Sequence, residues 1–355
     1  MLSIRYYDSF RFLKIAIWKL RNHDMTMSIP FPTEVALSAQ LAALLEVSGW
    51  PKPGNVHRTA DFPDTTFEEF LAGSVALGPA VEEAVRRGYK KGKEGKIEQI
   101  GIGELIKKAV KNVKRWHKGG NTHLGISFLF IPVAASVGLL KSREAEINHN
   151  NIKEAFKQIV RATTPEDAIH GYEAILIASS AALGRLKSVR APDLSANDFK
   201  ERILKEGVTL FDTMKISSEW DNISKEWVTG LEISVKTGLR TFLSTYSETK
   251  NVNIATVHTF LTILAKYPDT FIARKIGVEF EEDIKKAVSI GMKIAKEISR
   301  EAKEILEIGG MTTEEGRKRI LELDNNLRER DLNPGTTADI TANSIFLAIL
   351  HGFRP

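Results

Sequence analysis

The sequence predicts an all-α protein, and three observations carry this prediction. Apolar residues recur with the period of an amphipathic helix in almost every segment of the chain. Alternating strand patterns are almost absent. Short stretches of Gly, Pro, Asn and hydroxyl residues separate the periodic segments, as expected where helices begin and end. No internal repeat or linker stands out, so we expect a single multi-helix domain over residues 31–355.

The first half of this domain predicts four helices. A core-facing apolar stripe ends at Gly49. A second stripe starts near Thr66 and stops at Gly78 and Pro79, and residues 90–96 then form a solvated link. The last of the four segments is almost wholly apolar, and its length favours a central buried helix over a pair of strands. The expected helices lie at residues 35–48, 66–78, 102–116 and 125–140.

The second half predicts further helices of the same kind. Pro165 follows Thr164 and precedes two acidic residues, a pattern typical of a helix start. A long apolar stripe begins at Ile284 and is stopped by Gly309 and Gly310. The expected helices lie at residues 168–186, 197–206, 210–237, 284–305 and 338–350.

Residues 1–30 form a basic N-terminal extension outside the helical domain. Residues 1–22 mix aromatic side chains with Arg and Lys around an apolar run that Lys14 interrupts. This run is too short to span a bilayer and lacks a small-residue cleavage site. It is a disordered basic tail, a membrane-surface helix, or a stretch that precedes a true start at Met25 or Met27. No later window reaches the length of an uncharged membrane span, so we expect a soluble protein without one.

The composition is that of an ordinary globular protein, with 43% hydrophobic and 27% charged residues. The 355 residues include no Cys, which excludes disulfides, zinc–thiolate sites, iron–sulfur clusters and Cys nucleophiles. A cytoplasmic location is therefore the default, and the segments rich in Ile, Lys and Glu resemble thermophile usage. The net charge of +5 suits an anionic ligand, but Lys and Arg are interleaved with Glu, so we expect no nucleic-acid binding.

Three polar turns carry Gly and Asn beside a hydroxyl group or a base, at residues 51–58, 119–125 and 333–339. Such turns leave backbone N–H groups free beside a helix start, where phosphates bind well. One Gly or Pro is enough to end a helix. Three turns this rich in donors therefore predict a pocket for a phosphorylated ligand.

The first turn supplies candidate phosphate ligands. Lys52 and Arg58 carry positive charge, and Gly54 allows the backbone to approach a ligand closely. Asn55 belongs to the same predicted binding turn. His57 is a candidate proton carrier near neutral pH, or a hydrogen-bond partner of a neighbouring carbonyl group. A Lys-Pro-Gly turn on its own would simply end a helix.

The second turn places three polar residues at the mouth of the apolar helix. Asn121 or Thr122 can cap that helix, whereas His123 is harder to explain as a cap. The helix dipole and the free N–H groups would attract a phosphate here. All three residues are therefore candidate substrate ligands.

The third turn begins the last helix. Thr336 or Thr337 would cap it, and Asp339 occupies the capping-box region. A capping box alone is common, but the complete turn is not. We expect contacts to the ligand or a metal from Asn333, Gly335, Thr336, Thr337 and Asp339.

Carboxylates outside the second and third turns are further candidates. Asp221 lies between Trp220 and Ile223, so it is drawn towards the interior, unless residues 212–226 form a solvated charged face.

Asp269, with Arg274 and Lys275, forms a candidate metal or triphosphate cluster, or else the first turn and surface cations of an ordinary helix. Asp61 and Asp64 bind magnesium through water or cap the next helix. The candidate Mg²⁺ ligands are Asp61, Asp64, Asp269 and Asp339.

These turns, together with residues 267–277, resemble the CitG family, the triphosphoribosyl-dephospho-CoA synthases, in a branch found in archaea and some bacteria. The similar stretches are Pro-Lys-Pro-Gly-Asn-Val-His-Arg from Pro51, Asn-Thr-His-Leu-Gly from Asn121, Tyr-Pro-Asp-Thr-Phe from Tyr267 and Asn-Pro-Gly-Thr-Thr-Ala-Asp from Asn333. They follow one another in the family's order and cover most of the chain after residue 31.

The resemblance implies an all-helical, Mg²⁺-dependent transferase that uses ATP and dephospho-CoA. The ribose C1 of ATP joins a ribose hydroxyl of dephospho-CoA, adenine leaves, and the triphosphate is kept. Such a displacement passes through an oxocarbenium-like state, which carboxylates can stabilise, and it needs groups that move protons. The candidate catalytic residues are His57, Asp221 and Asp339.

Departures from the family pattern at His57, Leu124 and residues 268–275 leave the acceptor open. Another phosphorylated small molecule of cofactor biosynthesis could accept a phosphoribosyl-type group, or the protein could be a kinase. A helical nucleotide-binding protein without turnover is the alternative outside the enzymes. The oligomeric state is open as well, a homo-oligomer included.

Overall fold

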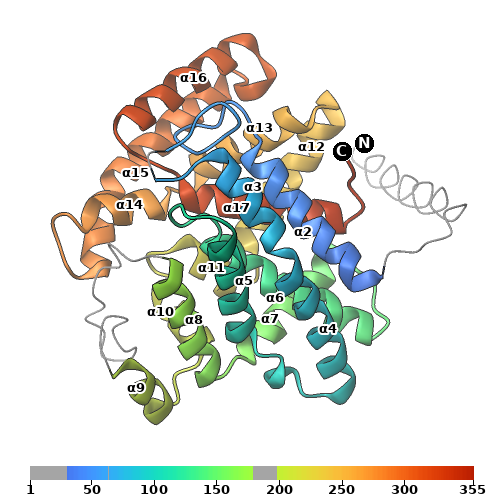
Figure 1. Ribbon diagram of the computed structural model, residues 1–355. Helices are drawn as coiled ribbons and strands as arrows, with labels where there is room; N and C mark the ends of the chain where they lie inside the picture. Colours follow the sequence, from blue (N-terminus) through green and yellow to red (C-terminus); the bar gives the residue numbers. More distant parts are fainter. Residues whose placement is uncertain (1–29, 63, 179–197) are drawn as a thin grey trace, which may run out of the picture. The chain divides into compact units, whose positions relative to one another are not determined.

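The computed structural model describes residues 30–62, 64–178 and 198–355. Within these residues the chain forms helices and turns, and its only strand-like pairings are two isolated bridges in the loop around residues 57–65. The protein is therefore all-α, as predicted (Figure 1). Residues 32–355 cluster as one compact unit. The prediction for the N-terminal extension falls on residues 1–29, outside the described residues.

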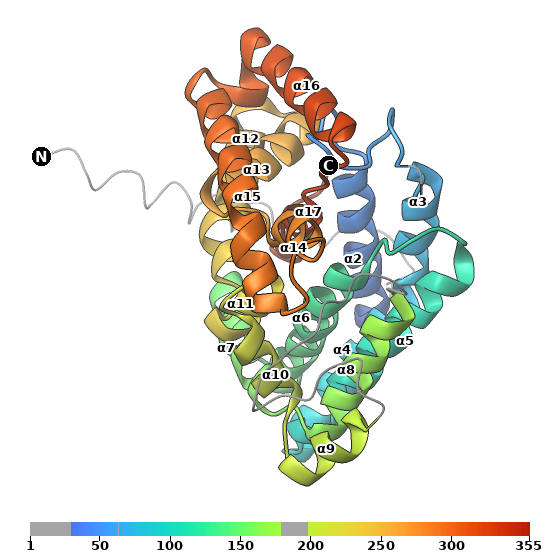
Figure 2. The same ribbon diagram turned by 90° about the vertical axis from the view of Figure 1, so that its left-hand side faces the viewer.

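The apolar segment forms α6 (Leu124–Ser142), the central buried helix that its length predicted. Helices from both halves of the chain pack around it (Figure 2). The approach of α4 is especially close, because a Cβ on Gly88 would lie 2.1 Å from the carbonyl oxygen of Ala135. The helices around α6 are α4 (Gly78–Glu94), α5 (Ile102–Trp116), α7 (His149–Arg161) and α17 (Gly335–Leu350).

By length and composition α6 could also cross a membrane. However, 83% of its apolar window is buried inside the protein. A core helix passes the same test, and burial on this scale is what a core helix needs. The apolar character of α6 is thus explained by its place at the centre of the fold.

Most predicted helices agree with the structure to within a few residues. Thr66 and Glu69 form a capping box at the start of α3, which explains why a new helix begins there. The helix expected at residues 168–186 is present up to Ala178, and residues 179–197 lie outside the described part. The agreeing helices are α2 (Phe31–Val47), α3 (Phe67–Ala76), α5, α8 (Pro165–Ala178), α9 (Phe199–Glu206) and α15 (Ile284–Glu307).

The link expected at residues 90–96 is wrong over its first part, because α4 continues to Glu94. Ion pairs on the outer side of α4 support the extra turns, with Arg87 2.5 Å from Glu83 and Lys91 2.8 Å from Glu94. The helix ends at Gly95, whose φ of 69° is the usual left-handed cap.

The single helix expected at residues 210–237 is also wrong. The chain forms α10 (Leu210–Ser217), α11 (Asn222–Thr229) and a π-helical turn (Ser234–Leu239) that leads into α12 (Arg240–Thr249). The Asp221 side chain accepts a hydrogen bond from the N–H of Ser224 and so starts a new helix. Gly230, with φ 72°, ends that helix. Local caps at both ends therefore interrupt a continuous apolar period.

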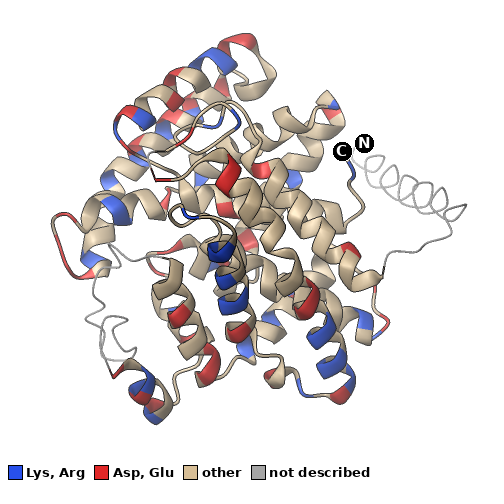
Figure 3. Cartoon of the chain, in the orientation of Figure 1, with Lys and Arg blue, Asp and Glu red and all other residues tan. Residues whose placement is uncertain are grey.

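A second core lies in the later part of the chain. Buried residues such as Phe260, Ile298 and Leu323 join four helices there. In Figure 3, Lys and Arg alternate with Asp and Glu along outer helices such as α16, in keeping with interleaved surface charges. The four helices are α13 (Val252–Lys266), α14 (Thr270–Gly277), α15 and α16 (Glu314–Glu329).

Candidate functional site

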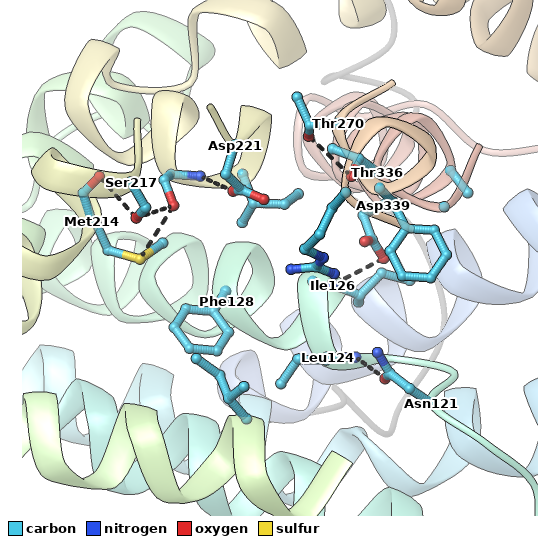
Figure 4. Close-up of a pocket in the computed structure, with 18 of the residues that line it drawn as sticks. Asn121, Leu124, Ile126, Phe128, Met214, Ser217, Asp221, Thr270, Thr336 and Asp339 are labelled. Carbon is cyan, nitrogen blue, oxygen red and sulfur yellow. Dashed lines mark hydrogen bonds between the residues drawn. The ribbon is translucent and has the colours of Figure 1, made fainter. Parts of the chain in front are cut away.

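A cavity of about 260 Å³ opens where the first turns of α6, α11, α14 and α17 meet. All three polar turns reach its wall, although they are far apart in the sequence. Figure 4 shows residues of these four helix starts around one space. The residues from the polar turns include Asn55, Asn121, Thr122, Asn333, Thr336 and Asp339.

Asn55 is the residue of the first turn that lines the cavity. Its Nδ2 donates a hydrogen bond of 2.7 Å to Oδ1 of Asn333, which ties the first turn to the third. The Oδ1 atom of Asn55 is buried and has no hydrogen-bond partner among the described residues. Two of the predicted ligand residues are thus held together at one corner of the cavity.

Lys52 does not reach the cavity, contrary to the phosphate contact expected of it. Its side chain is 0% exposed, and Nζ lies 2.5 Å from Oε1 of Glu46 and 3.1 Å from the Glu46 carbonyl oxygen. Gly54 also has a structural role in the turn, because its φ is 64° and its N–H donates a hydrogen bond of 2.8 Å to Oδ1 of Asp324. Glu46, which lines the cavity, is the residue that Lys52 holds.

His57 and Arg58 lie in the framework of the loop, away from the cavity wall. His57 is buried, with Nε2 2.9 Å from Oδ2 of Asp324, and desolvation lowers its pKa. Arg58 is exposed and donates to the carbonyl oxygen of Ser48 at 2.6 Å and to Oδ1 of Asn253 at 3.1 Å. These contacts place the expected proton carrier and phosphate ligand outside the pocket.

Asp61 and Asp64 are exposed and do not line the cavity either. Oδ1 of Asp61 accepts a hydrogen bond of 2.8 Å from the N–H of Phe67, which is the capping role left open by the sequence. The backbone carbonyl of Asp64 accepts from the N–H of Gly120 at 2.9 Å. Asp61 therefore caps α3, and Asp64 holds the second turn to the loop before α3.

Side chains of the second turn point to two places, the cavity and the core. Asn121 lines the cavity and caps α6, since its Oδ1 accepts from the N–H of Leu124 at 3.2 Å. Thr122 lines it as well, and its hydroxyl lies 2.9 Å from Nε2 of His117 and 2.7 Å from Nδ1 of His123. Burial lowers the pKa of His123 to about 3, so this ring is neutral and positions Thr122 from behind.

Asp269 joins the starts of α14 and α17. Its Oδ1 accepts from the N–H groups of Phe271 and Ile272, and its Oδ2 accepts from the N–H and the hydroxyl of Thr337, both at 2.7 Å. It is 0% exposed. With both oxygens occupied, Asp269 has no position left for a metal, and Thr337 is committed to it.

The predicted cap of the last helix is wrong. The helix begins one turn earlier than residue 338, at Gly335, and Pro334 occupies the capping position. Thr336 and Thr337 lie inside the first turn instead, where Asp269 supplies the acceptor that a capping side chain would have supplied. Thr336 and Gly335 are thereby free to line the cavity.

Two aspartates face the cavity. Oδ1 of Asp339 accepts a hydrogen bond of 3.1 Å from the N–H of Ile126 at the start of α6. A Cβ on Gly125 would lie 2.0 Å from Oδ2 of Asp339, so glycine is needed there. Burial, with the charges of Glu46, Asp269 and Asp221, raises the pKa of Asp339 well above its usual value. Asp221, at the start of α11, lines the same cavity, as Figure 4 shows.

Arg274 is the cationic residue among those that line the cavity. Its guanidinium lies 5.3 Å from the ring centre of Phe271, and no carboxylate of the described residues forms an ion pair with it. Lys275 points elsewhere, because its Nζ lies 2.6 Å from Oδ2 of Asp331. Of the predicted pair, Arg274 is therefore available to an anion.

The fit of Mg²⁺ to the site depends on the carboxylates at the cavity. Among the described residues, no group of three or more His, Asp or Glu side chains could hold a metal. Mg²⁺ commonly takes one or two carboxylates and completes its shell with waters and substrate phosphates. Asp221 and Asp339 satisfy that requirement, whereas Asp61, Asp64 and Asp269 lie outside the cavity.

Glu46 and Thr270 line the cavity but were not singled out from the sequence. Thr270 starts α14, and its hydroxyl lies 3.4 Å from that of Thr336. Glu46 is a charged residue on the buried face of α2, among Ala42, Ala43 and Val47. A lone acid in an otherwise apolar stripe is the signal that could have found it.

The other end of the cavity is apolar. Side chains of α6, α8, α10 and α11 close it, and the indole N–H of Trp227 fixes α11 to α6 through a 2.8 Å hydrogen bond to the carbonyl of Phe128. The cavity therefore suits a ligand with both an anionic and an apolar part. The apolar lining includes Phe128, Tyr172, Leu210, Met214 and Ile223.

Comparisons with known proteins agree on one family. The family model described as CitG, ATP:dephospho-CoA triphosphoribosyl transferase, matches residues 32–354. A Klebsiella pneumoniae protein named 2-(5''-triphosphoribosyl)-3'-dephosphocoenzyme-A synthase is 23% identical over 319 residues, covering 89% of this chain and 90% of that protein. A candidate synthase of the same name from Vibrio cholerae is 23% identical over 320 residues, covering 88% and 86%.

A solved structure is similar as well. A crystal structure of a candidate triphosphoribosyl-dephospho-CoA synthase from Archaeoglobus fulgidus is 28% identical, with a TM-score of 0.58. The match covers 81% of this chain and 100% of that chain. The family match over residues 32–354 includes all the residues that line the cavity.

Proposed function

The chain belongs to the CitG family of ATP:dephospho-CoA triphosphoribosyl transferases, and we propose that it joins the triphosphoribosyl group of ATP to 3'-dephospho-CoA with release of adenine. The observation that carries the proposal is the meeting of four helix starts, Arg274 and acidic side chains at one cavity. Such a site can grip a polyphosphate and present carboxylates to a ribose.

The triphosphate would lie against the starts of α14 and α17. The N–H groups in the first turn of a helix lack intrahelical acceptors and attract anions. The hydroxyls of Thr270 and Thr336 line the same corner, and Arg274 can add a charge-assisted hydrogen bond. Mg²⁺, when bound, would neutralise phosphate charge, and Asp221 is its better protein ligand because the raised pKa of Asp339 favours the protonated acid.

Asp339 would serve the departing base. As the bond between the ribose and adenine breaks, negative charge develops on the base and positive charge on the sugar. A carboxyl group whose pKa is raised by burial holds its proton more tightly than an ordinary Asp, and it can donate that proton to the adenine nitrogen. The first turn of α6 holds Asp339 in place for this step.

The apolar end of the cavity would receive an uncharged part of the ligands, the adenine ring or the pantetheine arm. This function needs ATP and a precursor of coenzyme A, which fits a cytoplasmic protein. His57, Arg58 and Lys52 would support the site from behind, since they lie off the cavity wall.

Chromatography of a reaction with ATP, Mg²⁺ and dephospho-CoA tests the proposal. We expect free adenine in a one-to-one ratio with a dephospho-CoA product that has gained the triphosphoribosyl group. Release of ADP instead would identify a kinase. Stabilisation by ATP without any product, for dephospho-CoA and a panel of other phosphorylated acceptors, would identify a binding protein and contradict the proposal.

A further inference from the structure

Glu46 has one carboxylate oxygen engaged and one directed to the cavity. Its side chain is almost completely buried, and Oε1 is held by Nζ of Lys52 at 2.5 Å. No described residue donates a hydrogen bond to Oε2. Because Glu46 forms part of the cavity wall, the small surface that it keeps faces the ligand space.

Glu46 is the ion-pair partner of Lys52 among the described residues. Lys52 also donates to the Glu46 carbonyl oxygen, and its Nζ lies 5.9 Å from the ring centre of Phe260. Arg328 and Asp324 of α16 act on Lys52 with opposite charges. A lysine fixed in this way fixes the rotamer of Glu46 and supplies its counter-charge.

The charge of Glu46 acts on Asp339, but the two carboxyl groups differ in the partners that offset their negative charge. Glu46 has a cation in direct contact, whereas Asp339 receives one backbone N–H and has no ion-pair partner among the described residues. Burial raises the pKa of Glu46, and Lys52 opposes that rise. The direct contact with Lys52 therefore gives Glu46 a counter-charge inside the protein that Asp339 lacks.

We propose that Glu46 is a further catalytic residue, the base that takes the proton of the acceptor hydroxyl, and that Lys52 is a positioning residue that keeps Glu46 ionised. This inference rests on the proposed transfer. It assigns the buried Glu46–Lys52 pair a role in catalysis, beyond holding α2 to the first turn.

The proton count of the two carboxyls stays constant through the step. The bond from ribose C1 of ATP to the adenine nitrogen breaks, and its electron pair goes to that nitrogen with the proton of Asp339. The acceptor oxygen forms the new bond to C1, and its proton goes to Oε2 of Glu46. Exchange with solvent after product release returns the proton to Asp339.

Glu46→Gln tests the base directly. We expect kcat for adenine release to fall roughly 100-fold or more, the range of general base catalysis. The stabilisation of the protein by ATP and Mg²⁺ should stay close to that of the wild type, because Gln keeps the shape and the contact to Lys52. Glu226→Gln is the matched control, since Glu226 is another buried glutamate that does not line the cavity. We expect its kcat to remain within threefold of the wild type.

Lys52→Met tests the positioning residue through the pH profile. Without the cation, Glu46 should ionise only at higher pH, so the rising limb of kcat/KM should move up by about one pH unit or more. A lysine that served only to hold the fold would leave this limb in place. Because Lys52→Met leaves a buried charge unpaired, the double variant Glu46→Gln/Lys52→Met provides a folded comparison. The double variant should have the same kcat as Glu46→Gln, and its pH profile should lack the rising limb of kcat/KM.

The carboxyl signals in ¹³C NMR test the ionisation of Glu46 without turnover. At pH 7, the carboxyl of Glu46 should give the signal of an ionised group, assigned by its loss in Glu46→Gln. The inference would be overturned by a protonated Glu46 at pH 7. It would also be overturned if kcat of Glu46→Gln stayed within threefold of the wild type, or if the rising limb of kcat/KM did not move in Lys52→Met. Absence of adenine release by a wild type with ionised Glu46 would instead count against the proposed transfer.

Discussion

The same residue type has different chemistry at different positions of this site, because the partners of each carboxylate differ. Asp269 has both oxygens occupied by four donors and is a structural connector. Asp339 accepts a single backbone N–H and opens to the cavity. Glu46 lies between these cases, with one oxygen engaged and one available. Counting the free lone pairs of each oxygen thus separates framework residues from residues that can act on a ligand.

Asp269→Asn should lower the free energy of unfolding by about 2–4 kcal/mol. The amide keeps one acceptor oxygen, but its NH₂ group would face donors at the start of a helix, in a buried place. Urea unfolding of the variant measures the loss. The control is Asp283→Asn, at the half-buried start of α15, where Asn is an equally good cap and a change below about 0.5 kcal/mol is expected. Equal stability of the two variants would show that the hydrogen bonds of Asp269 to the starts of α14 and α17 do not stabilise the fold.

Residue types in the polar turns indicated where a ligand would bind, but not which side chains would reach it. Asn55, Asn121 and Asn333 line the cavity as expected. Lys52 and His57, from the same turn as Asn55, point into the framework. The direction of a side chain in a turn is set by residues that are distant in the sequence, such as Asp324 for His57. No local pattern contains that information.

At the scale of elements, helix caps were more informative than apolar period. Thr66 with Glu69 and the Pro165 start mark real helices. The period alone suggested one helix over residues 210–237, and the cap at Asp221 divides it. That division matters for the site, because a continuous helix would have no free first turn at residue 222. The position of Asp221 at the cavity follows from the break.

Gly88→Ala tests the packing of α4 on α6. The added methyl group would lie 2.1 Å from a backbone oxygen, so one helix must shift. We expect the free energy of unfolding to fall by about 2–3 kcal/mol, the cost of overpacking a close helix contact. Thermal and urea unfolding measure this change. Lys90→Ala, an exposed position of the same helix, should stay within about 0.5 kcal/mol of the wild type. A stable Gly88→Ala protein would mean that α4 and α6 can separate without cost.

For the molecule as a whole, the fold brings together helix starts that are far apart in the chain. The starts of α6 and α17 are joined by Asp339, and the starts of α14 and α17 by Asp269. Asn222 at the start of α11 donates to the hydroxyl of Thr270 at 3.1 Å. Each helix start thus contacts another, and the cavity is the space that they share. The sequence placed the polar turns beside the starts of α6 and α17 and missed the start of α11, whereas the meeting of the four starts depends on the packing of the whole chain.

Stability of the whole molecule should depend on pH through Glu226. This residue is 0% exposed, and its oxygens accept from the N–H groups of Ile233 and Ser234 at 2.6 and 2.9 Å. Burial raises its pKa to about 7, whereas the unfolded chain has the ordinary value of about 4.5. The folded state therefore binds the proton more tightly.

The contribution of Glu226 is complete below about pH 4.5 and is lost as pH rises through about 7, a change of about 3 kcal/mol. Urea unfolding of the wild type and of Glu226→Gln at pH 5 and pH 8 measures it. The wild type should lose more stability than the variant between these two values, because Gln does not titrate. Parallel losses in both proteins would show that the Glu226 carboxyl is ionised without cost in the fold, with its two backbone donors balancing the burial.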